Sequence, residues 1–261
     1  MEHLLIRNCT VFGVGRDGIT LNGTDSTIDA VSVHTTGCGG ITTTGGDGRT
    51  LRAGNLTVRG SVIRHTNQWK RTYAPPLGFW GSGNRYENNT VASVPHSGIL
   101  GSGVNMSFVG NTLDSNCFET TDVGAFYTDG EIGDRGSKAN NFWIGRGSKI
   151  IGNTFRNIRT AYAGDKKGPG GLSAQAVYLD DMTSGYEVRN SPLPRVNYRA
   201  LYGNTILHGS SFRARSVWFR WRTIASSGAR SGRSWAAAAT TGSTTTTTRT
   251  APSRSTSTIA A

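Results

Sequence analysis

Two acidic residues, Asp122 and Asp180, each border a short apolar segment that contains a tyrosine. Asp122 precedes Val-Gly-Ala-Phe-Tyr127, and Asp180 follows Ala-Val-Tyr178-Leu. A protonated carboxylic acid beside a carboxylate is the catalytic pair of a glycosidase. Asp122 and Asp180 are therefore candidate catalytic residues, one acting as the acid and the other as the nucleophile or base.

Aligning the two segments places Tyr127 beside Tyr178 and Asp129 beside Asp180. Neighbouring strands lie about 4.8 Å apart, so these two carboxylates would lie about 5 Å apart. Like charges directly opposite each other are destabilising. We therefore expect either a carboxyl with a raised pKa or a bridging cation, for which calcium is the candidate. No other cofactor is predicted.

The same alignment gives a set of candidate substrate-binding residues, namely His96, Tyr127, Asp129, Tyr178 and Asp181. Each has a structural alternative, because Asp is common in turns and a single His is more often a packed residue. A carboxyl separation of about 5–5.5 Å accompanies retention of anomeric configuration, and about 6.5–9.5 Å accompanies inversion. The alignment leaves both outcomes open.

These residues lie within a repeat of about 22 residues. A Gly-Asn-Thr or Asn-Asn-Thr turn recurs at 88–90, 110–112, 152–154 and 203–205, each before an apolar residue. Each repeat holds about three short apolar segments, and helical periodicity is absent. One such unit cannot bury its own apolar face, so stacked coils must supply the core. The sequence predicts an all-β solenoid, a parallel β-helix, whose turn Asn side chains bond from coil to coil.

Four insertions interrupt the repeat, at 66–77, 130–142, 160–175 and 189–195. Insertions in solenoids form loops that often border a binding face. Aromatic residues lie in or next to them, at Trp69, Tyr73, Trp80 and Trp143. These side chains either stack on sugar rings or cover the edge of the core.

The repeat fades after His208. We predict a parallel β-helix over 1–208. Residues 209–261 are predicted to form a degenerate last coil, with a strand near 216–221, followed by a low-complexity tail of Arg, Ser, Thr and Ala that is disordered from about 222. The 261-residue chain carries a net charge of +12, yet no Asp or Glu follows Glu187. The positive excess therefore belongs to this C-terminal part, and we expect no nucleic-acid partner.

Several protein classes are excluded by pattern. Three cysteines without CxxC spacing favour neither a disulfide framework nor a zinc site. No apolar run is long enough to span a membrane, and the opening residues do not form a signal peptide. We expect a monomer without a membrane partner.

Three motifs taken together resemble a known group of carbohydrate-active proteins. They are Val94-Pro-His-Ser-Gly-Ile99, Glu119-Thr-Thr-Asp-Val-Gly-Ala-Phe-Tyr-Thr128 and the run 176–185. The chain resembles, over about 1–208, right-handed parallel β-helix proteins of the group that includes glycoside hydrolase family 141. The resemblance implies a polysaccharide substrate, an extracellular or secretory-pathway location, and Asp122 and Asp180 as the paired carboxylates, with Asp181 close behind.

One motif departs from that group, which usually continues Tyr-Thr-Gly-Arg-Asp-Trp where this chain reads Tyr127-Thr-Asp-Gly-Glu-Ile132. Three alternatives stay open. The first is a polysaccharide lyase or epimerase, in which Arg135, Lys138 or Lys149 would neutralise a uronate. The second is a carbohydrate-binding β-helix without catalysis, and the third is a truncated, inactive gene product.

Overall fold

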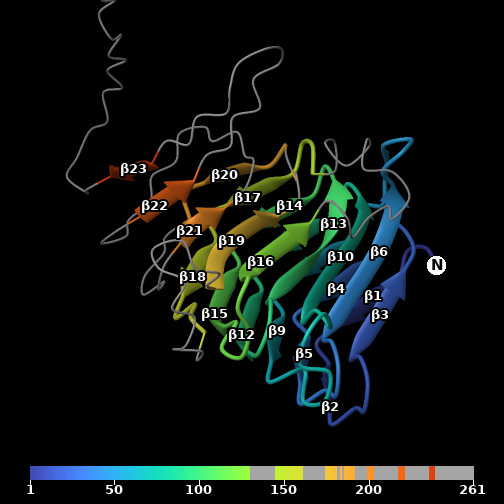
Figure 1. Cartoon of the computed structure of the whole chain (residues 1–261). Helices are drawn as coiled ribbons and strands as arrows, with labels where there is room; N and C mark the ends of the chain where they lie inside the picture. Colours follow the sequence, from blue (N-terminus) through green and yellow to red (C-terminus); the bar gives the residue numbers. More distant parts are fainter. Residues whose placement is uncertain are drawn as a thin grey trace, which may run out of the picture.

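The computed structural model describes residues 1–129, 145–160, 174–180, 183, 185–191, 199–202, 217–220 and 235–238. Every regular element in these residues is a β-strand, and no helix occurs among them. The strands form three parallel sheets, each of which takes one strand from successive repeats. Figure 1 shows these strands side by side, from blue near the N-terminus to orange. The all-β prediction is confirmed, and the stacking is compatible with a parallel solenoid.

The first two sheets are made of short strands. The first sheet contains β1 (Leu5–Arg7), β4 (Thr27–Asp29), β8 (Thr57–Arg59), β11 (Arg85–Glu87), β14 (Ser107–Val109), β17 (Lys149–Ile151) and β20 (Glu187–Arg189). The second contains β2 (Thr10–Phe12), β5 (Ser32–His34), β9 (Val62–Arg64), β12 (Thr90–Val94), β15 (Thr112–Asn116) and β18 (Thr154–Arg156).

The third sheet has longer strands and continues furthest toward the C-terminus. Its parallel members are β3 (Ile19–Asn22), β6 (Ile41–Asp47), β10 (Leu77–Ser82), β13 (Ile99–Val104), β16 (Val123–Asp129), β19 (Ala174–Asp180), β21 (Arg199–Tyr202) and β22 (Val217–Arg220). Two further strands pair antiparallel at its margins, β7 (Arg52–Ala53) with β6 and β23 (Trp235–Ala238) with β22.

The corner between the first and second sheets has the same form in successive coils. Two residues separate each strand of the first sheet from the next strand of the second, from β1–β2 to β17–β18. The first of the two has a positive φ in every case, and the residues are Asn8, Ala30, Gly60, Asn88, Gly110 and Gly152. Gly and Asn adopt this left-handed conformation with little strain, which explains why the Asn-Asn-Thr and Gly-Asn-Thr turns recur.

The core consists of equivalent residues stacked from coil to coil. In the first sheet the inward column is Ile6, Ile28, Val58, Tyr86, Phe108, Ile150 and Val188. In the third sheet it is Ile19, Ile41, Leu77, Ile99, Phe126 and Val177. Buried aromatic rings fill the middle coils, with Phe108 4.8 Å from both Phe79 and Phe126. Burying a side chain of this size stabilises the fold by about 1.5–3 kcal/mol.

A ladder of buried asparagines crosses the turns, as the sequence predicted. The Asn89 amide nitrogen Nδ2 donates to Asn111 Oδ1 at 3.0 Å, and Asn111 Nδ2 donates to Asn153 Oδ1 at 2.9 Å. The same oxygens also accept the backbone N–H groups of Asn89 and Asn111. Each asparagine side chain thus hydrogen-bonds polar groups at the turn that are buried from water and have no partner in the strand ladders.

Of the predicted insertions, the first is confirmed between β9 and β10, whereas 130–142 and most of 160–175 and 189–195 lie outside the described residues. The β6–β7 hairpin was not predicted. The expected strand near 216–221 is β22. Within the part predicted to be disordered, from about 222, the structure describes β23 alone, and the residues after it lie outside the described part.

Candidate active site

The connections between strands single out the third sheet. The first-to-second corner never lengthens in the described coils, whereas long segments enter and leave the third sheet. They include 65–76 between β9 and β10, 117–122 between β15 and β16, and the β6–β7 hairpin. Loops that collect beside one face of a solenoid usually border its binding site. The outer face of the third sheet is therefore the candidate binding face.

An aromatic cluster separate from the core lies on this outer face. Tyr127 on β16 pairs in register with Tyr178 on β19 and with Leu100 on β13, as the repeat alignment predicted for the two tyrosines. Their side chains pack together, and the partly buried Trp80 packs against them. The two tyrosine rings meet edge to face with centroids 5.3 Å apart, an arrangement that aromatic pairs favour.

Both predicted catalytic carboxylates are bonded to these tyrosines. Tyr178 donates its hydroxyl proton to Asp122 Oδ1 at 2.9 Å, and Tyr127 donates to Asp180 Oδ2 at 3.0 Å. Each tyrosine thus bonds to the acid that comes from the other coil. Hydrogen bonds to a carboxylate are about twice as strong as neutral ones. The structure therefore brings Asp122 and Asp180 to one cluster, tied together by two phenols.

Tyr178 and Asp180 are two residues apart on β19, so their side chains lie on the same face of the third sheet. Burial, followed by the negative charges of Asp180 and Asp122, raises the pKa of Tyr178 far above its usual value. The phenol therefore keeps its proton and donates a hydrogen bond to Asp122.

Local backbone features position this cluster. Asp122 has φ = 55° and is exposed, ahead of β16; Asp is among the few residues that adopt this conformation readily. The expected turn role for Asp122 and its bond to Tyr178 therefore coexist. Gly124 leaves room for the tyrosine, because a Cβ there would lie 2.6 Å from Tyr178 Cβ.

The structure describes some of the other predicted site residues and not others. Asp129 pairs with Asp180 in the strand register, as predicted. Asp181 lies outside the described residues, as do Glu131, Arg135 and Lys138. His96 is 6% exposed, and its ring centroid lies 4.8 Å from that of Tyr73. These contacts favour a packing role for His96 over direct contact with a substrate.

Burial of the His96 ring makes the stability of the folded chain depend on pH. Desolvation lowers its pKa to about 4, whereas an unfolded histidine has a pKa of about 6.5. Between these two pKa values the unfolded chain binds more protons than the folded chain does. The stability that depends on a neutral His96 is therefore complete above pH 6.5 and is lost as the pH falls toward 4. We expect wild type to lose up to about 3 kcal/mol relative to His96→Gln between pH 7 and pH 4, measured by urea unfolding. A pH-independent difference would contradict the prediction.

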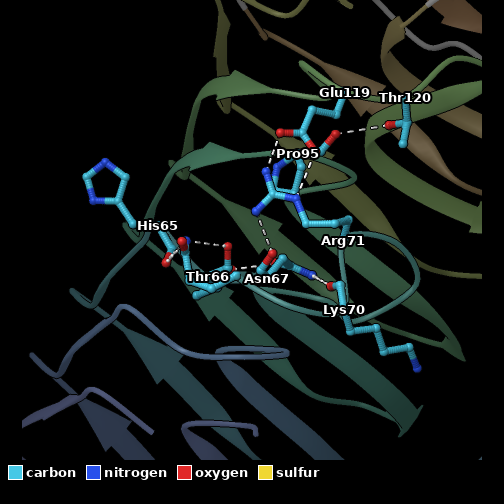
Figure 2. Close-up of polar contacts among 9 residues, drawn as sticks. His65, Thr66, Asn67, Lys70, Arg71, Pro95, Glu119 and Thr120 are labelled. Atoms are coloured by element: carbon cyan, nitrogen blue, oxygen red, sulfur yellow. Dashed lines mark hydrogen bonds and ion pairs between the residues drawn. The ribbon is translucent and has the colours of Figure 1, made fainter. Parts of the chain in front are cut away.

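A second polar cluster fixes the insertion between β9 and β10. Arg71 makes a two-pronged ion pair with Glu119, with Nε 2.8 Å from Oε2. The hydrogen bond from Arg71 holds the pKa of Glu119 below its usual value. Figure 2 shows the guanidinium between Glu119 and the backbone of Asn67, with Pro95 and Thr120 alongside. This contact could not be predicted from the repeat, because both residues lie outside the periodic strands.

No group of three or more His, Cys, Asp or Glu side chains in the described ranges could hold a metal ion. A bridging calcium ion therefore stays a prediction. The described residues also contain no helix that is long and apolar enough to cross a membrane. Comparisons with protein-family models, curated proteins and solved structures found no match to this chain.

Proposed function

We propose that this chain is a right-handed parallel β-helix protein that hydrolyses glycosidic bonds in a polysaccharide. The reaction takes place on the outer face of the third sheet, with Asp122 and Asp180 as the catalytic carboxylates. The observation that carries the proposal is the pair of crossed bonds from Tyr178 to Asp122 and from Tyr127 to Asp180. Two acids bonded to one tyrosine cluster, beside an aromatic surface, match the requirements of glycoside hydrolysis.

The paired acids can act by one of two routes, of which the first is double displacement. One carboxylate attacks the anomeric carbon and forms a glycosyl ester while the other protonates the leaving oxygen. The second group then removes a proton from water, which hydrolyses the ester and restores the first carboxylate. In the inverting route one carboxylate instead activates the attacking water while the other protonates the leaving oxygen, with about 6.5–9.5 Å between the carboxyl groups. The configuration of the first-formed product distinguishes the two routes.

The aromatic cluster supplies the apolar part of a carbohydrate site. Trp80 and Leu100 border the tyrosines on the same face, and sugar sites combine apolar surfaces with a few fixed polar groups. The crossed hydrogen bonds restrain both acids before substrate arrives. Such preorganisation lowers the cost of aligning the reacting groups.

The test is a digestion screen of soluble polysaccharides with the full chain, followed by assay of new reducing ends and by NMR of the first-formed anomer. We expect new reducing ends, and the configuration of the first-formed anomer assigns the retaining or the inverting route. An unsaturated product, detected by its ultraviolet absorbance, would assign the chain to the lyases instead. Glycan binding without any cleavage would contradict hydrolysis and favour a binding role.

A further inference from the structure

The insertion at 66–77 exposes two large aromatic side chains. Trp69 is 77% exposed and Tyr73 is 60% exposed. Isolated exposed aromatics are not unusual, but these two lie in one loop beside the face that carries the paired acids. The two side chains also have different neighbours. The Trp69 ring lies 4.0 Å from the place where a Cβ on Gly15 would be, whereas Tyr73 packs against His96.

This loop is braced by its own polar groups. Arg71 Nη1 donates to the Asn67 carbonyl at 2.8 Å, and Asn67 Nδ2 donates to the carbonyls of Lys70 at 3.0 Å and Ala74 at 2.6 Å. The ion pair between Arg71 and Glu119 then ties the braced loop to the coil of Asp122 (Figure 2). Tyr73 is thus held in a loop with little freedom left to lose on binding, which favours affinity.

A series of contacts connects Tyr73 to Asp122. The Tyr73 ring lies on His96 with an interplanar angle of 49°. The segment 117–122 runs alongside, because Cys117 N–H donates to the His96 carbonyl at 3.0 Å and Glu119 N–H to the Pro95 carbonyl at 3.1 Å. Asp122 ends this segment. Tyr73 therefore stands next to the part of the chain that supplies one of the two acids.

We propose that Tyr73 is a platform on which one sugar ring of a neutral polysaccharide stacks beside the bond that is cleaved. The inference rests on the proposed function and identifies the substrate class of the same site. The C–H face of a sugar ring matches the flat apolar face of an aromatic side chain. Glu119 already neutralises the guanidinium of Arg71, and Lys70 is the other cation of the loop. The contact that the Tyr73 ring offers is itself uncharged and requires no acidic group on the sugar.

The test measures binding of the full chain to soluble xylan, xyloglucan, mannan and β-glucan, with polygalacturonate as the acidic comparison. Affinity electrophoresis and calorimetry are performed in the Asp180→Asn background, so that cleavage does not deplete the ligand. We expect Tyr73→Ala to weaken binding of a neutral glycan about tenfold, and Tyr73→Phe to restore it because the ring is kept. Trp69→Ala is the matched control from the same loop, and we expect it to change affinity less than about twofold.

Each other outcome overturns the platform. These outcomes are unchanged binding in Tyr73→Ala, an equal loss in Trp69→Ala, tighter binding of polygalacturonate than of any neutral glycan, and no glycan binding at all. Thermal unfolding of each variant shows whether the loop change disturbs the fold. Binding that depends on Tyr73 without hydrolysis by wild type would reject the hydrolase while leaving the platform intact. Hydrolysis by Tyr73→Ala at the wild-type rate would reject the platform while leaving the hydrolase intact.

Discussion

Asp122→Asn and Asp180→Asn are each expected to lower the rate of glycan hydrolysis by about 10³-fold or more. An amide can neither attack the anomeric carbon as a carboxylate does nor donate the proton that the leaving oxygen requires. The side-chain carbonyl of Asn can still accept the hydrogen bond from Tyr178 or Tyr127, so the fold should persist. Reducing-end assays measure the loss, and thermal unfolding verifies that each variant is folded.

Asp114→Asn is the matched control, because Asp114 lies on β15, shortly before Asp122 in the chain, and pairs with Arg156 on the second sheet. We expect this variant to hydrolyse glycans at the wild-type rate. Full activity in either Asp122→Asn or Asp180→Asn would remove that residue from the mechanism. Where the first-formed product retains its configuration, adding azide to the Asp122→Gly and Asp180→Gly variants would separate the roles, since the configuration of the glycosyl azide reveals which carboxylate is the nucleophile.

Asn111→Ala is expected to destabilise the chain by about 2–4 kcal/mol. Asn111 is fully buried, accepts from the backbone and side chain of Asn89, and donates to Asn153 Oδ1 and the Tyr86 carbonyl. Alanine would leave these buried groups without partners, and each unpaired group costs about 1–3 kcal/mol. Urea unfolding monitored by tryptophan fluorescence measures the change.

Asn116→Ala provides the comparison for this ladder. Asn116 is buried at the end of β15, the strand that directly follows Asn111, but neither of its amide atoms has a hydrogen-bond partner among the residues that the structure describes. Its removal leaves no partner unpaired, so we expect a change within about 1 kcal/mol. Equal destabilisation by Asn111→Ala and Asn116→Ala would show that packing, not the ladder, sets the cost.

Periodicity explains what could be predicted from sequence. Residues that repeat with the coil occupy equivalent columns, so the alignment predicted the register of Tyr127 with Tyr178 and of Asp129 with Asp180. The asparagine ladder followed from the same argument, because a residue that recurs at one turn must meet its copy in the next coil. The three-sheet arrangement was therefore accessible from spacing alone.

Contacts that break the period could not be predicted. Asp122 is not the strand neighbour of Tyr178, yet a left-handed turn and the space above Gly124 bring them within 2.9 Å. Arg71 and Glu119 lie in two segments that have no counterpart in the plain coils. Packing of Tyr73 on His96 likewise depends on the path of an inserted loop, which the spacing of apolar residues does not specify.

The spacing of the ladder asparagines along the sequence shows how much longer one coil is than another, and hence the free energy that closing the longer coil costs. Asn89 and Asn111 are 22 residues apart, whereas Asn111 and Asn153 are 42 apart. Loop-closure entropy grows only with the logarithm of length, so nearly doubling the coil costs about 0.6 kcal/mol. Burial of a single methylene group, at about 0.8 kcal/mol, offsets that amount. A lineage of such proteins can therefore lengthen the loops beside its third sheet with little thermodynamic penalty, while the short first-to-second corner keeps successive coils in register.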